Sequence, residues 1–167
     1  MQPKLAVELQ ILDERIRTWG LPRYHSEMAA GIDLLACLDS PLLLEPQSPA
    51  VLVPSGVAIH IGDPGVAAVI VPRSGLGHKL GLVLGNLIGV LDADYTGQVF
   101  VSCWNRSGTH MDPVVINPGD RIAQLLFLPI LRPKIVLVDN FSRPSVRGAG
   151  GFGSTGLTLP IEGGVPE

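Results

Sequence analysis

The sequence GVLDADYTGQV, residues 89–99, interrupts a mainly apolar part of the chain that runs from residue 80 to residue 101. Two carboxylates, a tyrosine and a glycine lie at its centre, a pattern that predicts a β-hairpin with a polar tip. Taken alone, the pattern is also that of an ordinary turn, in which Asp92 and Asp94 only cap backbone N–H groups. The polar segments elsewhere in the chain decide between these two interpretations.

The composition indicates a folded domain with an unusually uncharged surface. Charged residues make up 16% of the 167 residues and hydrophobic residues 46%, whereas about 25% of the residues of an average soluble domain are charged. A chain of this length is expected to form one domain with a substantial core. Because a subunit that hides part of its surface needs fewer charges, we expect an oligomer.

Charge and cysteine usage exclude several classes of protein. The net charge is −3 and there is no run of lysine or arginine, so we expect no long nucleic acid as partner. No apolar stretch reaches the roughly 18 residues that span a bilayer, and no signal peptide is apparent, which predicts a cytoplasmic protein without a membrane partner. Cys37 and Cys103 are too few for a disulfide scaffold or a zinc site and are expected to be buried thiols.

Short apolar runs separated by turn residues predict an all-β fold. The chain contains 20 glycines and 15 prolines, which divide it throughout. One short helix is expected at 74–80. Many short strands of this kind are typical of a sandwich, jelly roll or barrel. The predicted strands are 7–12, 42–44, 50–53, 57–61, 66–71, 99–104, 114–116, 125–131 and 135–141.

The last part of the chain differs from the rest. From about residue 143 it is rich in glycine and loses the apolar pattern. There is no internal repeat and no linker before that point. We therefore expect a β domain at 1–142, followed by a C-terminal arm at 143–167 that is flexible when nothing is bound.

Two polar segments precede the predicted hairpin. Asp33 lies in the otherwise apolar segment 29–36, and a buried carboxylate needs a partner such as an arginine, a backbone amide or a hydrated metal; a turn aspartate is the alternative. In the segment 72–77, PRSGLG, Arg73 and Ser74 come where a strand ends and a short helix is expected to begin. They could bind an anion, or Ser74 could only cap the helix.

Two further segments follow the hairpin. In 119–124, GDRIAQ, a turn leads into a strand whose Gln124 could point into a site, although a turn with an ion pair explains the segment equally well. In 147–156, RGAGGFGSTG, the glycines match a dinucleotide fingerprint only by spacing, because no strand leads into a helix there. This segment could instead fold over a nucleotide with Phe152 stacked on the base, or be a disordered linker.

Taken in order, these five segments resemble the five sequence motifs of the trimeric dUTPases, over residues 5–156. Asn86 and residues 104–106 resemble the bacterial branch of that family. The resemblance implies the jelly-roll or β-barrel-like fold of the family and a cytoplasmic homotrimer with shared active sites. It also implies Mg²⁺-assisted hydrolysis of dUTP to dUMP and pyrophosphate, which keeps uracil out of DNA and supplies dUMP for thymidylate synthesis.

The resemblance also assigns roles to residues. Asp92 is the catalytic base that takes a proton from the attacking water, and Asp33 holds Mg²⁺ through water. The residues that bind the phosphates are Arg73, Ser74, Gly75 and Gln124. The residues in and next to the segment 89–99 that bind the deoxyuridine, besides Asp92, are Asn86, Val90, Leu91, Tyr95 and Phe100. The residues of the arm that close over the nucleotide are Arg147, Phe152, Gly153, Ser154 and Thr155. The alternative for Arg73 is a structural pairing with a carboxylate of the hairpin.

Two other functions remain open at this point. The related dCTP deaminases share the fold and some motif residues with the dUTPases, but Asp92, Tyr95 and the complete Gly-Phe-Gly arm favour a dUTPase. A non-enzymatic jelly-roll binding module or capsid-like assembly protein would explain the β pattern and an oligomer. It would not explain five polar segments suited to phosphate.

Overall fold

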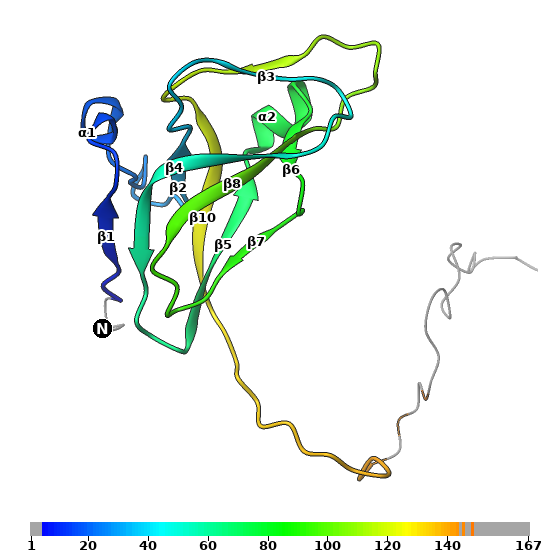
Figure 1. Cartoon of the computed structure of the whole chain (residues 1–167). Coiled ribbons are helices and arrows are strands. Elements are labelled where there is room, and N and C mark those ends of the chain that lie inside the picture. Colours follow the sequence, from blue (N-terminus) through cyan, green and yellow to red (C-terminus); the bar gives the residue numbers. More distant parts are fainter. Residues whose placement is uncertain (1–4, 144, 146–147, 149–167) are drawn as a thin grey trace, which may run out of the picture. The chain divides into compact units, whose positions relative to one another are not determined.

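The computed structural model describes residues 5–143, 145 and 148 (Figure 1). The chain divides into two compact units, Met1–Arg132 and Pro133–Glu167. All helices and strands of the described residues belong to the first unit. They are β1 (Glu8–Ile11), α1 (Arg15–Trp19), β2 (Ile32–Leu35), β3 (Leu42–Leu44), β4 (Val51–His60), β5 (Val66–Pro72), α2 (Ser74–Lys79), β6 (Leu82–Leu84), β7 (Gly89–Leu91), β8 (Gln98–Asn105), β9 (Val114–Ile116) and β10 (Arg121–Pro129).

The first unit is built from two four-stranded sheets and one strand pair. The strand orders are β1-β4-β8-β6 and β2-β10-β5-β7, and β3 pairs with β9. Every pairing is antiparallel. The predicted all-β class and its jelly-roll-like architecture are confirmed.

The core lies between inward-facing side chains of both sheets. Along β8, Val99, Val101 and Cys103 are buried, whereas Phe100 and the other alternate residues point outward. This is the two-residue period expected for a sheet with one buried face. The core residues that are least exposed include Leu34, Leu44, Val53, Val99, Val101, Ile116 and Leu125.

The central segment 89–99 does not form the predicted hairpin. β7 pairs with β5 in one sheet, while β8 pairs with β4 and β6 in the other. The polar residues between β7 and β8 therefore cross from one sheet to the other. The alternation of side chains identifies the two strands, but it does not specify which distant strand each one meets.

The predicted break at Pro54 and Gly56 is also wrong, because β4 continues through both residues. The register between β4 and β8 shifts between Pro54 and Ala58. Gly56 has a φ of +71°, in the left-handed region that glycine adopts without strain. A β-bulge thus accommodates residues that would otherwise end a strand.

The predicted helix at 74–80 is confirmed as α2, but a second short helix, α1, was not expected. Its apolar residues are too few to give a helical period. The strands β2 and β6 were likewise not predicted as separate elements.

The predicted strand at 135–141 is absent, since none of these residues is in a strand. Leu137 and Phe141 are more than nine-tenths exposed. An apolar run forms a strand only where another strand pairs with it, and the described part of this chain supplies no such partner.

Both cysteines are free and buried, as predicted. Burial raises the pKa of the Cys103 thiol to about 12 and also raises that of Cys37. No helix among the described residues is long and apolar enough to cross a membrane.

Candidate active site

Asp33 on β2 is the centre of a polar cluster at one end of the second sheet. In the register of this sheet, Asp33 lies opposite Gln124 of β10 and Gln124 lies opposite Val71 of β5. Arg73 comes two residues after Val71. Because side chains two residues apart share a face of the chain, Asp33, Gln124 and Arg73 meet on the same side.

Four side chains surround the Asp33 carboxylate, which is itself buried. Gln124 Nε2 donates a hydrogen bond to Oδ1 at 3.3 Å, and Arg121 Nη1 donates to Oδ2 at 3.4 Å. Arg73 Nε lies 3.2 Å from Oδ1, and His25 Nε2 lies 3.2 Å from Oδ2. Two guanidinium groups thus offset the cost of burying this charge, as the sequence predicted for a buried aspartate.

The partner of Arg73 differs from the predicted alternative. Arg73 pairs with Asp33 rather than with a carboxylate of the central segment. Its Nη1 also donates to the backbone oxygen of Arg121 at 3.1 Å. The guanidinium is therefore held in one orientation by two contacts on two different strands.

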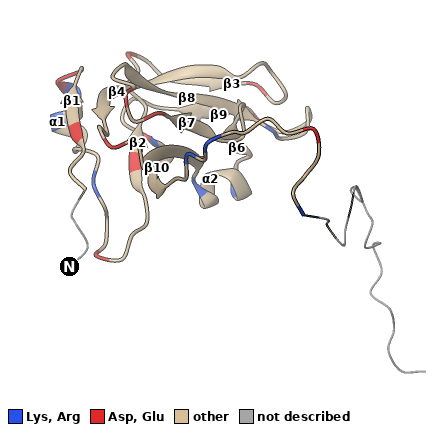
Figure 2. Ribbon diagram, turned by 90° about the horizontal axis from the view of Figure 1, so that it is seen from below, with Lys and Arg blue, Asp and Glu red and all other residues tan. Residues whose placement is uncertain are grey.

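A cleft of about 330 Å³ lies beside this cluster and brings together the four residues predicted to bind phosphate. Figure 2 shows basic positions at α2, in blue. The residues that line the cleft are Arg73, Ser74, Gly75, Leu76, Lys79, Leu80 and Gln124. Two cationic side chains and the amide of Gln124 make the cleft suited to an anion.

Ser74 does not cap the helix, so that alternative is wrong. The N-cap position of α2 is Arg73, which has an extended backbone and makes no capping hydrogen bond with its side chain. Ser74 is the first helical residue and is exposed. The Ser74 hydroxyl therefore does not cap α2, which was the structural role that the sequence left open.

Asp92 lies in a different cleft, of about 470 Å³. Asp92 is exposed and follows directly after β7. The lining of this cleft is mainly small and apolar, with two carboxylates, one histidine and one arginine. Its residues are His60, Gly62, Pro64, Val66, Ala67, Asp92, Ala93, Asp94, Ile130 and Arg132.

One chain does not bring Asp92 and Arg73 together. Leu91, the neighbour of Asp92, pairs with Ala68 near the start of β5, whereas Arg73 follows the end of the same strand. Arg73 lies five residue steps along the chain from Ala68, a distance of about 16 Å at roughly 3.3 Å per step. The two predicted parts of the site lie at opposite ends of β5.

The tyrosine of the central segment is fixed by its own loop. The Tyr95 hydroxyl donates to the backbone oxygen of Gln98 at 2.8 Å. Its ring lies against Gly97, where an added Cβ would be 2.6 Å from the hydroxyl oxygen. Glycine at 97 is therefore needed for the position of the ring, which stays 40% exposed.

Of the other residues predicted to bind deoxyuridine, Asn86, Val90 and Leu91 lie in or just before β7, whereas Phe100 lies on β8 in the other sheet. Asn86 is exposed in the connection from β6 to β7, and Val90 and Phe100 are exposed while Leu91 is partly buried. β7 is an edge strand of its sheet. Its outer backbone edge can therefore hydrogen-bond a planar ligand. The predicted residues Arg147, Phe152, Gly153, Ser154 and Thr155 lie outside the described residues.

Two members of the cluster around Asp33 were missed from the sequence. Arg121 belongs to the segment 119–124, where the sequence suggested only a turn with an ion pair. His25 is one of four histidines in the chain, and no local pattern distinguishes it from the others. Both are identified only by their distance to Asp33 in the folded chain.

The side chains that could ligate a metal ion limit how one could bind here. Among the described residues, no group of three or more His, Cys, Asp or Glu side chains could hold one. Mg²⁺ is commonly bound through one or two carboxylates together with substrate phosphates and several waters. Asp33 beside the phosphate cleft fits that arrangement.

Comparison with known proteins places this chain in a family. The family model described as dUTPase matches residues 17–156. A deoxyuridine 5'-triphosphate nucleotidohydrolase of Paraburkholderia xenovorans is 55% identical over 152 residues, which cover 91% of this chain and 99% of that relative. The enzyme of the same name from Burkholderia mallei is 53% identical over the same length.

Solved structures of lower identity have the same fold. The dUTPase of Staphylococcus bacteriophage 80alpha, determined with dUPNHPP, is 25% identical with a TM-score of 0.76, covering 91% of this chain and 99% of that one. A mutant dUTPase of phage phi11 of S. aureus, which coordinates a structural Mg(II) ion, is 24% identical with a TM-score of 0.70, covering 83% of this chain and 99% of that one. With a family match over most of its length and relatives more than half identical to it, this chain belongs to the dUTPase family.

Proposed function

We propose that this protein hydrolyses dUTP to dUMP and pyrophosphate through Mg²⁺-assisted attack of water on the α-phosphorus. The observation that carries the proposal is the convergence of Arg73, Gln124 and the exposed start of α2 beside the buried Asp33. This cleft offers an anion fixed donors and a carboxylate, in a chain that belongs to the dUTPase family.

The phosphate cleft stabilises the charge that develops in the reaction. Phosphoryl transfer depends on positioned donors at the phosphate oxygens and the leaving group. Arg73, Ser74, Gly75 and Gln124 supply those donors, and Arg73 is oriented in advance by its contacts with Asp33 and with the backbone of Arg121. Asp33 would hold Mg²⁺ through water, and the ion would neutralise part of the charge of the triphosphate.

Asp92 takes the proton from the attacking water. Water is a weak nucleophile near neutral pH, and a carboxylate in hydrogen-bond reach makes it stronger. Asp92 is exposed at the end of β7, where its carboxylate is accessible to solvent and substrate.

The edge of β7 selects the base. Its outer backbone and the Asn86 amide pair with the uracil edge, and cytosine would leave one of these donors or acceptors unpaired. Val90, Leu91 and Phe100 complete this part of the site. The floor of the pocket rejects the methyl group of thymine, a discrimination of about 1–3 kcal/mol.

The Tyr95 ring packs against the deoxyribose and leaves no room for a 2′-hydroxyl. Tyr95→Ala is therefore expected to reduce the preference for dUTP over UTP by about 10- to 100-fold. The ratio of kcat/KM for the two nucleotides measures it. Tyr95→Phe keeps the ring and should keep the preference, and Tyr24→Ala removes the other tyrosine of the chain, which is also exposed. A preference unchanged in Tyr95→Ala would place the discrimination against ribose in another residue.

We further propose a homotrimer with shared active sites. Asp92 and Arg73 lie at opposite ends of β5 in one chain, so a complete site takes them from two chains. The outer face of the first sheet also exposes Leu52 and Phe100, on neighbouring strands. Apolar residues exposed in this way suit a contact with further copies.

The arm at 143–167 completes the site from a neighbouring chain. Its Phe152 stacks on the uracil, and Arg147 with Gly153, Ser154 and Thr155 closes over the γ-phosphate. Closure of such an arm excludes water from the reacting groups. The predicted domain boundary at 142/143 belongs to this proposal, and the compact first unit ends earlier, at Arg132.

The proposal also covers where the enzyme acts, what it binds and what its reaction is for. The enzyme acts in the cytoplasm on a free nucleotide, with no nucleic acid or membrane as partner. Hydrolysis of dUTP keeps uracil out of DNA and supplies dUMP for thymidylate synthesis.

A panel of nucleoside triphosphates tests the function, with pyrophosphate and ammonia measured separately, with and without Mg²⁺. We expect pyrophosphate from dUTP only, dependent on Mg²⁺, and no ammonia. Release of ammonia from dCTP would instead identify a deaminase. The absence of pyrophosphate from dUTP in the presence of Mg²⁺ would contradict the proposal and support a non-enzymatic module.

A further inference from the structure

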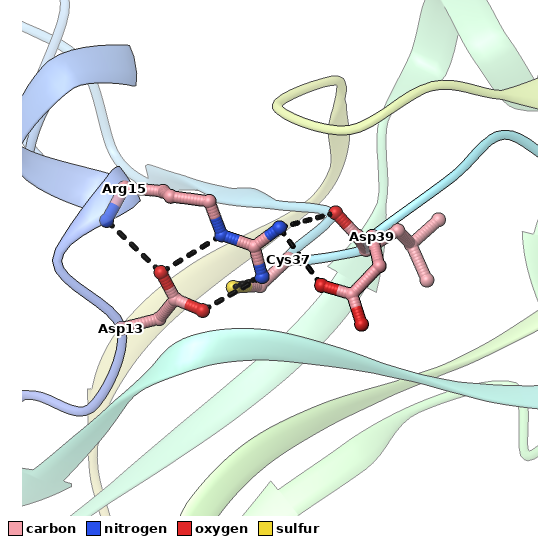
Figure 3. Close-up of polar contacts among 5 residues, drawn as sticks. Asp13, Arg15, Cys37 and Asp39 are labelled. Carbon is pink, nitrogen blue, oxygen red and sulfur yellow. Dashed lines mark hydrogen bonds and ion pairs between the residues drawn. The ribbon is translucent and has the colours of Figure 1, made fainter.

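Arg15 makes polar contacts with several residues on different segments of the chain (Figure 3). Its Nε and Nη2 donate to the two oxygens of Asp13 at 3.0 and 2.7 Å. Its Nη1 donates to the backbone oxygen of Leu38 at 2.9 Å and lies 2.9 Å from Asp39 Oδ1. The Arg15 guanidinium also holds the pKa of the Asp13 carboxyl well below its usual range.

The guanidinium of Arg15 also fixes a tryptophan. It lies over the Trp19 ring, 5.3 Å from the ring centre, within the range of a cation–π interaction. Trp19 is the last residue of α1 and packs against a small core cluster that contains Ile16 and Cys37. Arg15 and Trp19 thus form one unit, which we call the α1 clamp.

The Trp19 ring of the α1 clamp contacts the turn that precedes β10. Gly119 in this turn has a φ of +83°, and a Cβ added there would lie 3.1 Å from the Trp19 ring. The positive φ and the close approach of the ring both require glycine at this position. The ring therefore lies against the backbone of the turn without an intervening side chain.

A second route connects the clamp to the same turn. The backbone nitrogen of Gly119 donates to the Ala36 oxygen at 2.8 Å, and the Ala36 nitrogen donates to the Asp120 oxygen at 2.8 Å. Ala36 is two residues from Leu38, whose oxygen accepts from Arg15. The segment after β2 is thus held by Arg15 on one side and by the turn on the other.

The turn leads directly into Arg121, the first residue of β10. The Arg121 side chain donates to Asp33, and its backbone oxygen accepts from Arg73. Its position thus affects both the carboxylate and the guanidinium of the phosphate cleft. A small displacement of groups that hold a substrate can cost a large part of an enzyme's activity.

We propose that Arg15 and Trp19 are positioning residues of the phosphate side of the active site, acting through the Gly119–Asp120 turn on Arg121. Neither residue touches the cleft, and neither is expected to contact the nucleotide. This inference rests on the proposed function, because it concerns binding of the triphosphate in that cleft.

The test compares Trp19→Ala and Arg15→Gln with the unmodified protein in steady-state kinetics with dUTP. We expect the KM for dUTP to rise by about 10-fold in each variant, because the phosphate donors are displaced. Affinity for dUMP, which lacks the β- and γ-phosphates, should change much less. Trp19→Phe keeps an aromatic ring against Gly119 and should restore a KM close to that of the unmodified protein.

Arg17→Gln is the matched control on the same helix. Arg17 makes an exposed ion pair with Glu14 at 2.8 Å and does not contact the clamp's partners. The KM of Arg17→Gln for dUTP should therefore equal that of the unmodified protein. Melting temperatures, measured for every variant, separate loss of folded protein from loss of binding. Should Trp19→Ala fail to fold, Trp19→Leu keeps apolar volume without the ring and serves the same comparison.

The outcomes separate this inference from the proposed function. A raised KM for dUTP in Trp19→Ala and Arg15→Gln, with dUMP affinity and the control unchanged, supports the positioning role. A lower melting temperature with an unchanged KM for dUTP would overturn it and leave a structural role only. Hydrolysis of dUTP by the unmodified protein reports on the proposed function independently of the variants.

Discussion

Asp92→Asn is expected to lower kcat for dUTP by about 10²–10⁴-fold, which is the usual contribution of a general base. Asparagine has nearly the same size and shape as aspartate but does not take a proton from water. The side chain is exposed at the end of β7 and makes no hydrogen bond that supports the fold among the described residues. The variant should therefore fold and bind nucleotide like the unmodified protein.

Single-turnover kinetics with dUTP, together with binding of a non-hydrolysable analogue, measure the two effects separately. Asp94→Asn is the matched control, because Asp94 is also exposed and lines the same cleft. It should retain most of its activity. Turnover of Asp92→Asn at the unmodified rate would remove Asp92 from the role of base.

A chain that ends at residue 146 should fold and assemble normally but lose at least about 10²-fold in kcat/KM for dUTP. The deletion removes Arg147, Phe152 and the Ser154-Thr155 pair, which we propose to close over the nucleotide, but none of the strands of the compact unit. Open sites admit water and leave the γ-phosphate with fewer donors. Steady-state kinetics and the melting temperature measure the two effects. Unchanged kinetics would show that the arm is not part of the site.

Mixing the truncated chain with Asp92→Asn extends this prediction to the shared site. In mixed trimers, some sites combine the intact Asp92 of a truncated chain with the intact arm of an Asp92→Asn chain. We therefore expect activity to recover after the two variants are denatured and refolded together. A mixture that stays inactive would contradict the proposal that one site takes residues from several chains.

Asp33 shows what the sequence could predict about the site and what it could not. A single carboxylate within an apolar segment predicted a partner such as an arginine, a backbone amide or a hydrated metal, because burying an unpaired charge is costly. Arg73 and Arg121 supply that partner in the structure. Which arginines would do so was not predictable, since the contact depends on the register of β2, β10 and β5.

The central segment shows the opposite case. The strand predicted at 99–104 lies close to the observed β8, but the predicted hairpin does not form, because β7 and β8 pair in different sheets. Local alternation reports which side of a strand is buried and contains no information on the distant strand that pairs with it. The strand predicted at 135–141 is absent for the same reason, because a strand forms only where another strand pairs with it.

By itself, the sequence determined the all-β class and most of the strands, because these depend on side-chain chemistry and on spacing within short segments. The predicted phosphate-binding residues came from the resemblance of the motifs to those of the dUTPases. Only the tertiary structure decided the path of 89–99 between sheets, the separation of Asp92 from Arg73, and the contact of Trp19 with Gly119. Each of these joins or separates residues that are distant in the chain. Such placement follows from the packing of all strands around one core, which no local pattern specifies.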